Sequence, residues 1–481
     1  MPLPESGELI ERIARLRGVG DAYYDNHAVL RHFPLATRTA ILRAMGAPVD
    51  DPAQLAPMLA QLESARWHKL LTRVVVEHGP SVTLDVHLAD ALLDTPLQWQ
   101  LLTAQGERLA GVIHPQTLLE AQRCQLEHRG YSRRRWPLPV QLADGYHELQ
   151  LSSSQENRSS CRVIVVPQHC YEPPVLADGG RCWGLTVQLY SLRSQNNWGI
   201  GDFDDLETLL QAVAPLGAAY VGVNPLHALF PSYPQHCSPY GASSRHFLNV
   251  LNIALPRVPE FASSAAAQQH VSMLTISGSL ARLRAAEYID YAGVAAAKIA
   301  VLELLYAEFR APRRSADRRR IKAFRRFVSD GGRSLELHAL FDALDAHFTA
   351  PGRDPGWLSW PEPFRSPDSP AVRSFAEANR ERVEFYQYLQ WLADEQLTAA
   401  QALAKRLGMS IGLYGDYAVG AHAAGSETWS DVGTYRLGAA IGAPPDPLAL
   451  KGQDWGIPPQ DPGALVEQQL TPFIELLRNN C

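Results

Sequence analysis

A loop rich in polar and aromatic residues follows an apolar run at residues 185–198. Leu185, Val187 and Leu189 alternate with polar residues, which predicts a strand. The loop after it ends in Asn197 and Trp198. Amide groups and a flat ring in one loop suit a neutral polyhydroxyl ligand. The alternative is an ordinary loop between a strand and a helix, with solvated polar residues.

An apolar run followed by a polar loop occurs twice more in the sequence. Residues 219–226 form a buried apolar run, and the irregular, proline-rich segment 227–249 follows it. Residues 411–414 form a third apolar run, and Asp416 follows it directly. Strands that alternate with helical segments predict a parallel sheet. The carboxyl ends of such strands meet at one edge, so the three loops should converge.

Asp416 and Glu427 are the local pair of carboxylates. Retaining glycosyl transfer uses two carboxylates about 5 Å apart, one as nucleophile and one as acid and then base. Spacing alone therefore offers this pair for catalysis. His227 and His236 are not expected to bind a metal, because irregular chain separates them and no carboxylate cluster joins them.

The composition is that of an ordinary globular chain. Its 481 residues are 46% hydrophobic and carry a net charge of −6, which gives no reason to expect nucleic acid as a partner. The six cysteines include no CxxC pair, so we expect free thiols in a reducing compartment. We expect a cytoplasmic protein, because the N-terminus lacks a secretion signal and no apolar run reaches the length of a membrane span.

The pattern of apolar residues changes along the chain. Residues 1–75 have helical spacing, and residues 76–168 have the alternation of short strands, which predicts a β-sandwich. Residues 177–481 alternate strands with helices, and a helical insertion interrupts them at about 256–406. Trp99 and Trp136 of the sandwich could stack on a sugar, although core positions are at least as well supported.

An arginine-rich segment, residues 313–326, lies within the insertion. It could indicate an anionic ligand. Ile321, Phe324 and Val328 form an apolar face on the same segment, however, so we interpret the arginines as the solvated side of an amphipathic helix.

Seven segments together resemble the 4-alpha-glucanotransferases, also called amylomaltases or disproportionating enzymes. They are WGLTVQLYSLRSQNNWGIGDFDDL from Trp183, GVNPLHALFP from Gly222, SPYGASSRHFLNV from Ser238, WPEPF from Trp360, GLYGDYAVGAHAAGSETWSD from Gly412, GAPPDPLALKGQDWGIPPQDP from Gly442 and PFIELLR from Pro472. The resemblance extends from about Leu84 to Cys481, and no single motif carries it alone.

The resemblance implies transfer of α-1,4-glucan segments from a donor maltooligosaccharide to an acceptor glucose or glucan. The reaction would be a retaining double displacement through a covalent glucosyl-enzyme, without a cofactor or a metal. Maltooligosaccharides and glucose are the expected partners; no membrane and no obligate protein partner is expected.

The family's nucleophile and acid/base belong to motifs that do not occur in this sequence and would follow Cys481. We therefore assign no catalytic residue and do not name Asp416 and Glu427 as the pair. The expected fold is α/β, an incomplete (β/α)8 TIM-type barrel with a large helical insertion, preceded by a small helical segment and a β-sandwich. This chain alone is expected to be inactive.

Several positions match the family's substrate-contacting segments. Tyr240 could stack on a glucose face or serve as a loop anchor beside Pro239, and Asp416 resembles the family's donor-site aspartate. Trp455 matches a loop that overhangs the glucan groove in the family. Gly415 departs from the larger residue usual there, which leaves the local loop shape open. The candidate substrate-binding residues are Ser238, Tyr240, Asp416, Trp455, Asn197 and Trp198.

Two other functions remain open. One is hydrolysis by a member of the wider α-amylase clan, and the other is glucan binding without catalysis. Products that a full-length version forms with and without an added glucose acceptor would separate transfer from hydrolysis, and activity of this chain alone would separate an enzyme from a binding protein.

Overall fold

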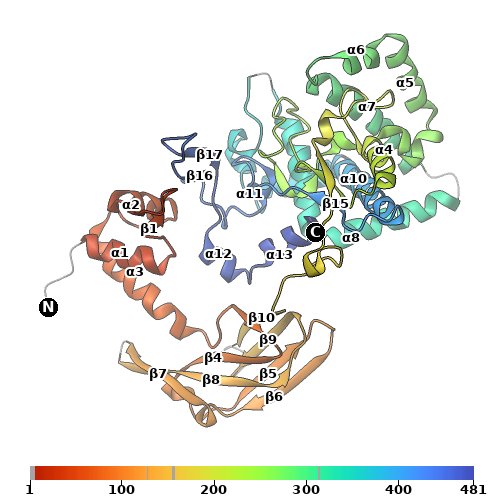
Figure 1. The fold of residues 1–481 in the computed structure, drawn as a ribbon. Helices are drawn as coiled ribbons and strands as arrows, with labels where there is room; N and C mark the ends of the chain where they lie inside the picture. The colour runs from red at the N-terminus through yellow and green to blue at the C-terminus, as the bar shows by residue number, and fades with distance from the viewer. Residues whose placement is uncertain (1–5, 127, 154–157, 312–314, 351, 481) are drawn as a thin grey trace. The chain divides into compact units, whose positions relative to one another are not determined.

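The structure, a computed structural model, describes residues 6–126, 128–153, 158–311, 315–350 and 352–480. The chain divides into two compact units (Figure 1). The first comprises residues 1–171, 436–454 and 459–474, and the second comprises residues 172–435, 455–458 and 475–481. Segments after Tyr435 therefore belong in part to each unit.

The first unit begins with a small helical cluster. Its elements are α1 (Ser6–Leu16), β1 (Ala22–Tyr24), β2 (Leu30–His32), α2 (Leu35–Ala44) and α3 (Pro52–Ala65). Ile13, Leu42 and Leu55 are fully buried and form its core. The helical spacing of apolar residues that was predicted for residues 1–75 therefore places them on one buried face of each helix.

Two sheets pack against each other in the same unit. Their strands are β3 (Val74–His78), β4 (Ser81–Ala89), β5 (Leu97–Leu102), β6 (Arg108–Ile113), β7 (Leu119–Leu126), β8 (Arg129–Gln141), β9 (Gly145–Ser152) and β10 (Arg158–Val166). The sheet orders are β3-β10-β9-β5-β6 and β4-β8-β7. Burial alternates along the strands, as in Leu97, Trp99 and Leu101 of β5. The predicted β-sandwich is confirmed.

The two tryptophans of the sandwich belong to its core. Trp99 is 6% exposed and Trp136 is 2% exposed, and their ring centroids lie 6.1 Å apart. Both rings are therefore withdrawn from the surface on which a sugar could stack.

A parallel sheet organises the second unit. Its strands are β11 (Gly184–Val187), β12 (Tyr220–Val223) and β15 (Gly412–Gly415), in the order β11-β12-β15. Val221 pairs with Leu185 on one side and with Leu413 on the other. Strand β12 is shorter than the predicted residues 219–226, because Pro225 has no amide hydrogen to continue the ladder. The α/β class is confirmed.

Helix α4 (Phe203–Val213) follows the first strand and has a capping box. The Asp202 side chain accepts from the backbone amides of Asp204 and Asp205, and the Asp205 carboxylate accepts from the amide of Asp202 at 3.0 Å. Asp202 is thus the N-cap of this helix. The α-helix ends at Val213 and gives way to a 3-10 turn at Ala214–Leu216, because Pro215 has no amide hydrogen for the α-helical hydrogen bonds.

The predicted insertion at 256–406 is helical. It contains α5 (Ala265–Ile276), α6 (Ser279–Ala285), α7 (Tyr291–Arg310), α8 (Ser315–Phe348), α9 (Pro370–Ala378) and α10 (Arg380–Arg406). Helix α10 packs on α4 and β15 (Figure 1). In the arginine-rich stretch, Phe324 is buried and Arg325 and Arg326 are exposed, as expected for a solvated helix side.

One buried lysine joins the insertion to the sheet-bearing segment. The Lys298 ammonium donates to the carbonyl oxygens of Leu251 at 2.7 Å and Ile253 at 2.9 Å, and lies 3.8 Å from the Asp202 carboxylate. Burial lowers the pKa of Lys298, while the Asp202 charge opposes that shift. The insertion therefore makes specific polar contacts with the segment that carries the predicted loop.

The remaining elements are short. They are β13 (His227–Ala228), β14 (Ser244–Leu248), α11 (Ser426–Ser430), β16 (Ile441–Ala443), β17 (Gln453–Ile457), α12 (Pro462–Glu467) and α13 (Thr471–Asn480). In the described part of the chain, the five cysteines are free thiols and no helix has the length and apolar character needed to span a membrane.

Substitution of Gly201 by alanine should disturb the loop that follows β11. A Cβ atom on Gly201 would overlap the carbonyl oxygen of Leu189, so backbone must move. We expect a loss of about 1–3 kcal/mol in the free energy of unfolding, measured by urea denaturation. Gly433→Ala is the control, because the nearest atom to its added Cβ is 3.9 Å away. Equal stability of the two variants would contradict the packing described for Gly201.

Candidate functional site

The ends of the three parallel strands hold one another. The Asp416 amide donates to the carbonyl oxygen of Val223 at 3.1 Å, which ties the residue after β15 to the end of β12. The Leu189 amide donates to Asn224 Oδ1 at 2.7 Å, which ties the loop after β11 to the residue after β12. The three loops therefore start from one edge of the sheet, as predicted.

Tyr240 and Asp416 meet at this edge. The Tyr240 hydroxyl donates to Asp416 Oδ2 at 2.8 Å. Tyr240 is 53% exposed, and Asp416 is also exposed. The hydrogen bond to Asp416 raises the pKa of the Tyr240 phenol. The pair presents a neutral ring, a hydroxyl and a carboxylate together to solvent.

The turn before Tyr240 is fixed by two hydrogen bonds. The Gly241 amide donates to the Ser238 carbonyl at 3.1 Å, and the His236 ring lies 3.1 Å from the Gly241 carbonyl through Nε2. Ser238 is exposed on this turn. Its position within two residues of Tyr240 brings it close to the predicted site.

Asn197 and Trp198 are buried, at 1% and 3% exposure. The Asn197 side-chain amide donates to the Leu192 carbonyl at 3.1 Å and to Asp205 at 2.9 Å, and its oxygen accepts from the Gly199 amide at 3.2 Å. These bonds use the polar groups that a ligand would need. The burial of both residues favours a role in shaping the loop over contact with a ligand.

Trp455 lies on β17 and is 43% exposed. A partly exposed indole has a face available for contact with an apolar or sugar surface. The structure therefore leaves Trp455 partly accessible on β17.

A buried ion pair supports the segment that follows Asp416 in the sequence. Arg245 and Glu427 are 4% and 5% exposed. The guanidinium donates to Glu427 Oε1 through Nη2 at 2.7 Å and through Nε at 3.1 Å, and the backbone amide of Arg245 donates to Oε2 at 2.7 Å. Tyr435 also donates its hydroxyl to this carboxylate.

The electrostatics of Glu427 follow from these contacts. Burial opposes ionisation, but the charge and the hydrogen bonds of Arg245 outweigh it and lower the pKa of Glu427 to about 2. A permanently ionised, bonded carboxylate is a poor general acid. The pairing with Arg245 therefore argues against a catalytic role for Glu427.

The Arg245 guanidinium also reaches the chain beyond Asp416. Its Nη1 donates to the Val419 carbonyl at 2.9 Å. From the other side, His227 Nε2 accepts from the Ala418 amide at 3.2 Å. Burial lowers the pKa of His227 to about 4, so the ring is neutral near pH 7 and keeps a lone pair for this bond.

Arg245 and His227 were not predicted as supports of the site. Arg245 is separated from Glu427 by 182 residues, and no local pattern couples them. The sequence does offer one signal, since Arg245 is an arginine in an otherwise uncharged strand segment. Buried arginines are almost always paired, so a partner for Arg245 could have been expected. Within the described residues, no group of three or more histidine, cysteine or acidic side chains is arranged to hold a metal ion.

Comparison with known proteins agrees with these observations. Residues 187–481 match the family model described as 4-alpha-glucanotransferase, and residues 70–167 match that of the MalQ N-terminal beta sandwich domain. The chain belongs to the 4-alpha-glucanotransferase family.

Individual relatives carry the same description. A 4-alpha-glucanotransferase of Haemophilus influenzae is 38% identical over 348 residues, which cover 72% of this chain and 49% of that protein. One of Mycobacterium bovis is 34% identical over 99% of this chain and 64% of its own length. The crystal structure of amylomaltase from Corynebacterium glutamicum has a TM-score of 0.80 at 28% identity, over 98% of this chain and 63% of that one. The chain thus spans between about half and two thirds of the length of these relatives.

Replacement of Glu427 by glutamine should destabilise the protein strongly. It leaves the Arg245 guanidinium buried without a counter-charge, for which a loss of about 3–5 kcal/mol is typical. Urea denaturation measures this loss. Asp416→Asn is the control, and because Asp416 is exposed its effect should stay within about 0.5 kcal/mol. Similar stability of Glu427→Gln and the wild type would contradict the support role.

The neutral form of His227 predicts a pH dependence of stability. Its pKa is about 4 in the folded protein against 6.5 for the free side chain, so the unfolded state binds the proton first. This contribution is fully present above pH 6.5 and is lost as the pH falls toward 4. His227→Gln keeps an acceptor and cannot titrate, so the slope of unfolding free energy over this range should flatten. The exposed His27→Gln should keep the wild-type slope, and an unchanged slope in His227→Gln would refute the assignment.

Proposed function

We propose that the protein functions in the transfer of α-1,4-glucan segments between maltooligosaccharides, and that Tyr240 and Asp416 bind the donor glucan. The observation that carries the proposal is the solvent-facing Tyr240–Asp416 pair at the carboxyl edge of the parallel sheet, with its 2.8 Å hydrogen bond. A carboxylate accepts hydrogen bonds from sugar hydroxyls, and a tyrosine ring offers an apolar face to the pyranose.

Asp416 serves in binding and not in chemistry under this proposal. Retention of configuration needs two carboxylates on opposite sides of the anomeric carbon. Glu427, the nearby acidic residue in sequence, is committed to Arg245. Asp416 is then suited to hold and orient hydroxyl groups, and the nucleophile and the acid/base are other residues.

The remaining candidates have supporting roles in the same proposal. Ser238 is exposed two residues from Tyr240 and can exchange hydrogen bonds with a hydroxyl. Trp455 would cover bound glucan and exclude water, which favours transfer over hydrolysis. Asn197 and Trp198 would shape the loop from within the core.

The finer architecture is part of the proposal. We infer that β11, β12 and β15 are strands of a (β/α)8 barrel, with residues 256–406 as its helical insertion. We further infer three domains at residues 1–75, 76–168 and 177–481. The parallel order of these strands and the capped helix α4 between the first two support the inference.

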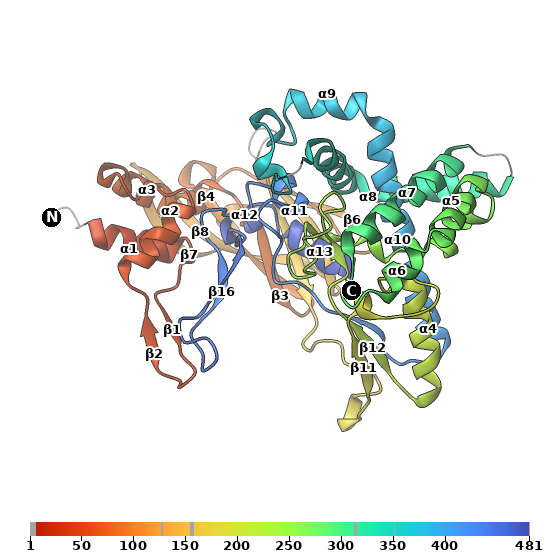
Figure 2. The same ribbon diagram turned by 90° about the horizontal axis from the view of Figure 1, so that it is seen from above.

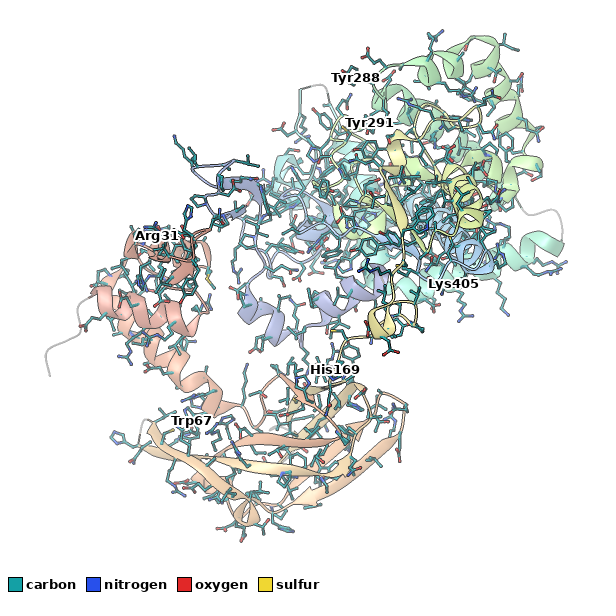
Figure 3. All side chains as sticks on the ribbon, in the orientation of Figure 1. Arg31, Trp67, His169, Tyr288, Tyr291 and Lys405 are labelled. Atoms are coloured by element: carbon teal, nitrogen blue, oxygen red, sulfur yellow. The ribbon has the colours of Figure 1, made fainter. Side chains whose placement is uncertain are left out.

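Variants of the pair test the proposed site through maltotriose affinity. We expect Asp416→Asn to weaken binding by about 10- to 100-fold, because a charged acceptor is lost, and Tyr240→Phe by up to about tenfold. Isothermal titration of the whole chain with maltotriose is the measurement. Tyr288→Phe is the matched control, since this tyrosine is 81% exposed near the start of α7 (Figure 3). Wild-type affinity in Asp416→Asn would remove the site from the proposal.

Product analysis separates the proposed reaction from its alternatives. Transfer converts maltotriose to glucose and to oligosaccharides longer than the substrate, and added glucose acceptor shifts the distribution. Hydrolysis yields glucose and maltose only and does not respond to the acceptor. Because this chain alone is expected to be inactive, binding without any product is compatible with the proposal. Robust transfer by this chain that is abolished in an Asp416 variant would reassign Asp416 from binding to chemistry.

A further inference from the structure

Figure 2 labels the helices α8, α9 and α10 of the insertion, and residues of these helices line a cavity of about 630 Å³. It is lined by parts of all three helices and has apolar walls that include Leu340 and Val383. It contains none of the residues assigned to the Tyr240–Asp416 site. The cavity is therefore a separate feature of the second unit.

Gln387 lines this cavity and is the unusual residue in it. Its side chain is only 9% exposed, and within the described residues its amide has no hydrogen-bond partner. The other glutamines of α10 differ. Gln390 and Gln396 each make two bonds to the backbone of one residue, and Gln401 accepts from the Leu413 amide. The amide atoms of Gln387 are not fully enclosed, so they are open to water and to a ligand that enters the cavity.

A helix break gives α8 its course beside the cavity. Gly332, which lines the cavity, has φ +50° and ψ −142°, outside helical geometry. This left-handed region favours glycine, because other residues are strained there. No atom lies within 4 Å of an added Cβ, so packing does not require a glycine. The backbone conformation does, and it directs α8 along the cavity.

The charges around the cavity are mixed. The lining includes two cationic residues, Arg333 and Arg380, and three acidic residues, Glu336, Glu377 and Glu384. Arg333 pairs with Asp368 and Glu384 accepts from Tyr306, whereas Arg380, Glu336 and Glu377 have no partner among the described residues. An anion or a cation would meet as much repulsion as attraction here. A neutral ligand with many hydroxyl groups can use donors and acceptors together.

We propose that this cavity is a second binding site, for a glucose unit of a neutral maltooligosaccharide. Gln387 and Arg380 donate to its hydroxyls, Glu336 and Glu377 accept from them, and Leu340 and Val383 contact its apolar face. The choice of glucan as the polyhydroxyl ligand rests on the proposed function; the position of the site does not. Such a site would keep the enzyme on a glucan chain between reactions at the sheet edge.

Titration of the whole chain with maltotriose tests the proposal. Two classes of binding site are expected, one at the cavity and one at the Tyr240–Asp416 pair. Gln387→Met is nearly isosteric and removes the amide, and Arg380→Ala removes the unpaired guanidinium. Each should weaken binding at the cavity by about tenfold. Lys405→Ala, an exposed cation on the same helix and labelled in Figure 3, should leave both classes unchanged. Asp416→Asn should weaken only the other class. Far-UV circular dichroism and the melting temperature establish that each variant is folded.

Carboxyl labelling locates the ligand without a substitution. Saturating maltotriose should slow carbodiimide modification of Glu336 and Glu377 several-fold in the wild type and in Asp416→Asn. Unchanged labelling, or binding that is lost in Asp416→Asn and untouched in Gln387→Met, would overturn the second site and leave the proposed function standing. Absence of all maltotriose binding would overturn both.

Discussion

The buried ion pair between Arg245 and Glu427 is the constraint on which the site depends. Each charge is withdrawn from water, so each needs full compensation by hydrogen bonds. The carboxylate receives the guanidinium, the Arg245 amide and the Tyr435 hydroxyl, and the guanidinium also donates to the Val419 carbonyl. This requirement fixes the relative positions of β14, α11 and the segment after Asp416. His227 completes the support through the Ala418 amide.

The same arrangement separates support from recognition. Arg245 and Glu427 are buried and ionised, and His227 is buried and neutral. Tyr240 and Asp416, in contrast, face solvent. A sugar hydroxyl offers only a few weak bonds, and these contribute most when the protein groups are already in place. A rigid buried layer behind an exposed pair meets that condition. It also explains why the acidic residue closest in sequence to Asp416 is unsuited to proton transfer.

Much of the fold could be predicted because its signals are local. Alternation in strand β5, helical spacing in α1 and the capping aspartate at Asp202 each act over a few residues. The meeting of Tyr240 and Asp416 also followed, since strand ends of a parallel sheet share one edge. Element ends were harder to predict: prolines at 215 and 225 cut α4 and β12 short.

The supports could not be predicted for a physical reason. The bond between Arg245 and Glu427 joins residues far apart in sequence, and its strength comes from burial, which exists only in the folded chain. Asn197 and Trp198 show the converse: their types suit sugar binding, but their burial gives them internal partners. The unpaired amide of Gln387 is equally invisible in sequence, because its neighbours Gln390 and Gln396 have the same side chain and satisfied bonds.

A double-mutant cycle tests most directly whether the ion pair acts on the ligand through Asp416. Maltotriose affinity would be measured for the wild type, Glu427→Gln, Asp416→Asn and the double variant, at a temperature where all four are folded. If the pair positions the Asp416 segment, Glu427→Gln weakens binding in the wild-type background and has little further effect once Asp416 is replaced. Full additivity of the two changes, or unchanged affinity in Glu427→Gln alone, would contradict the account.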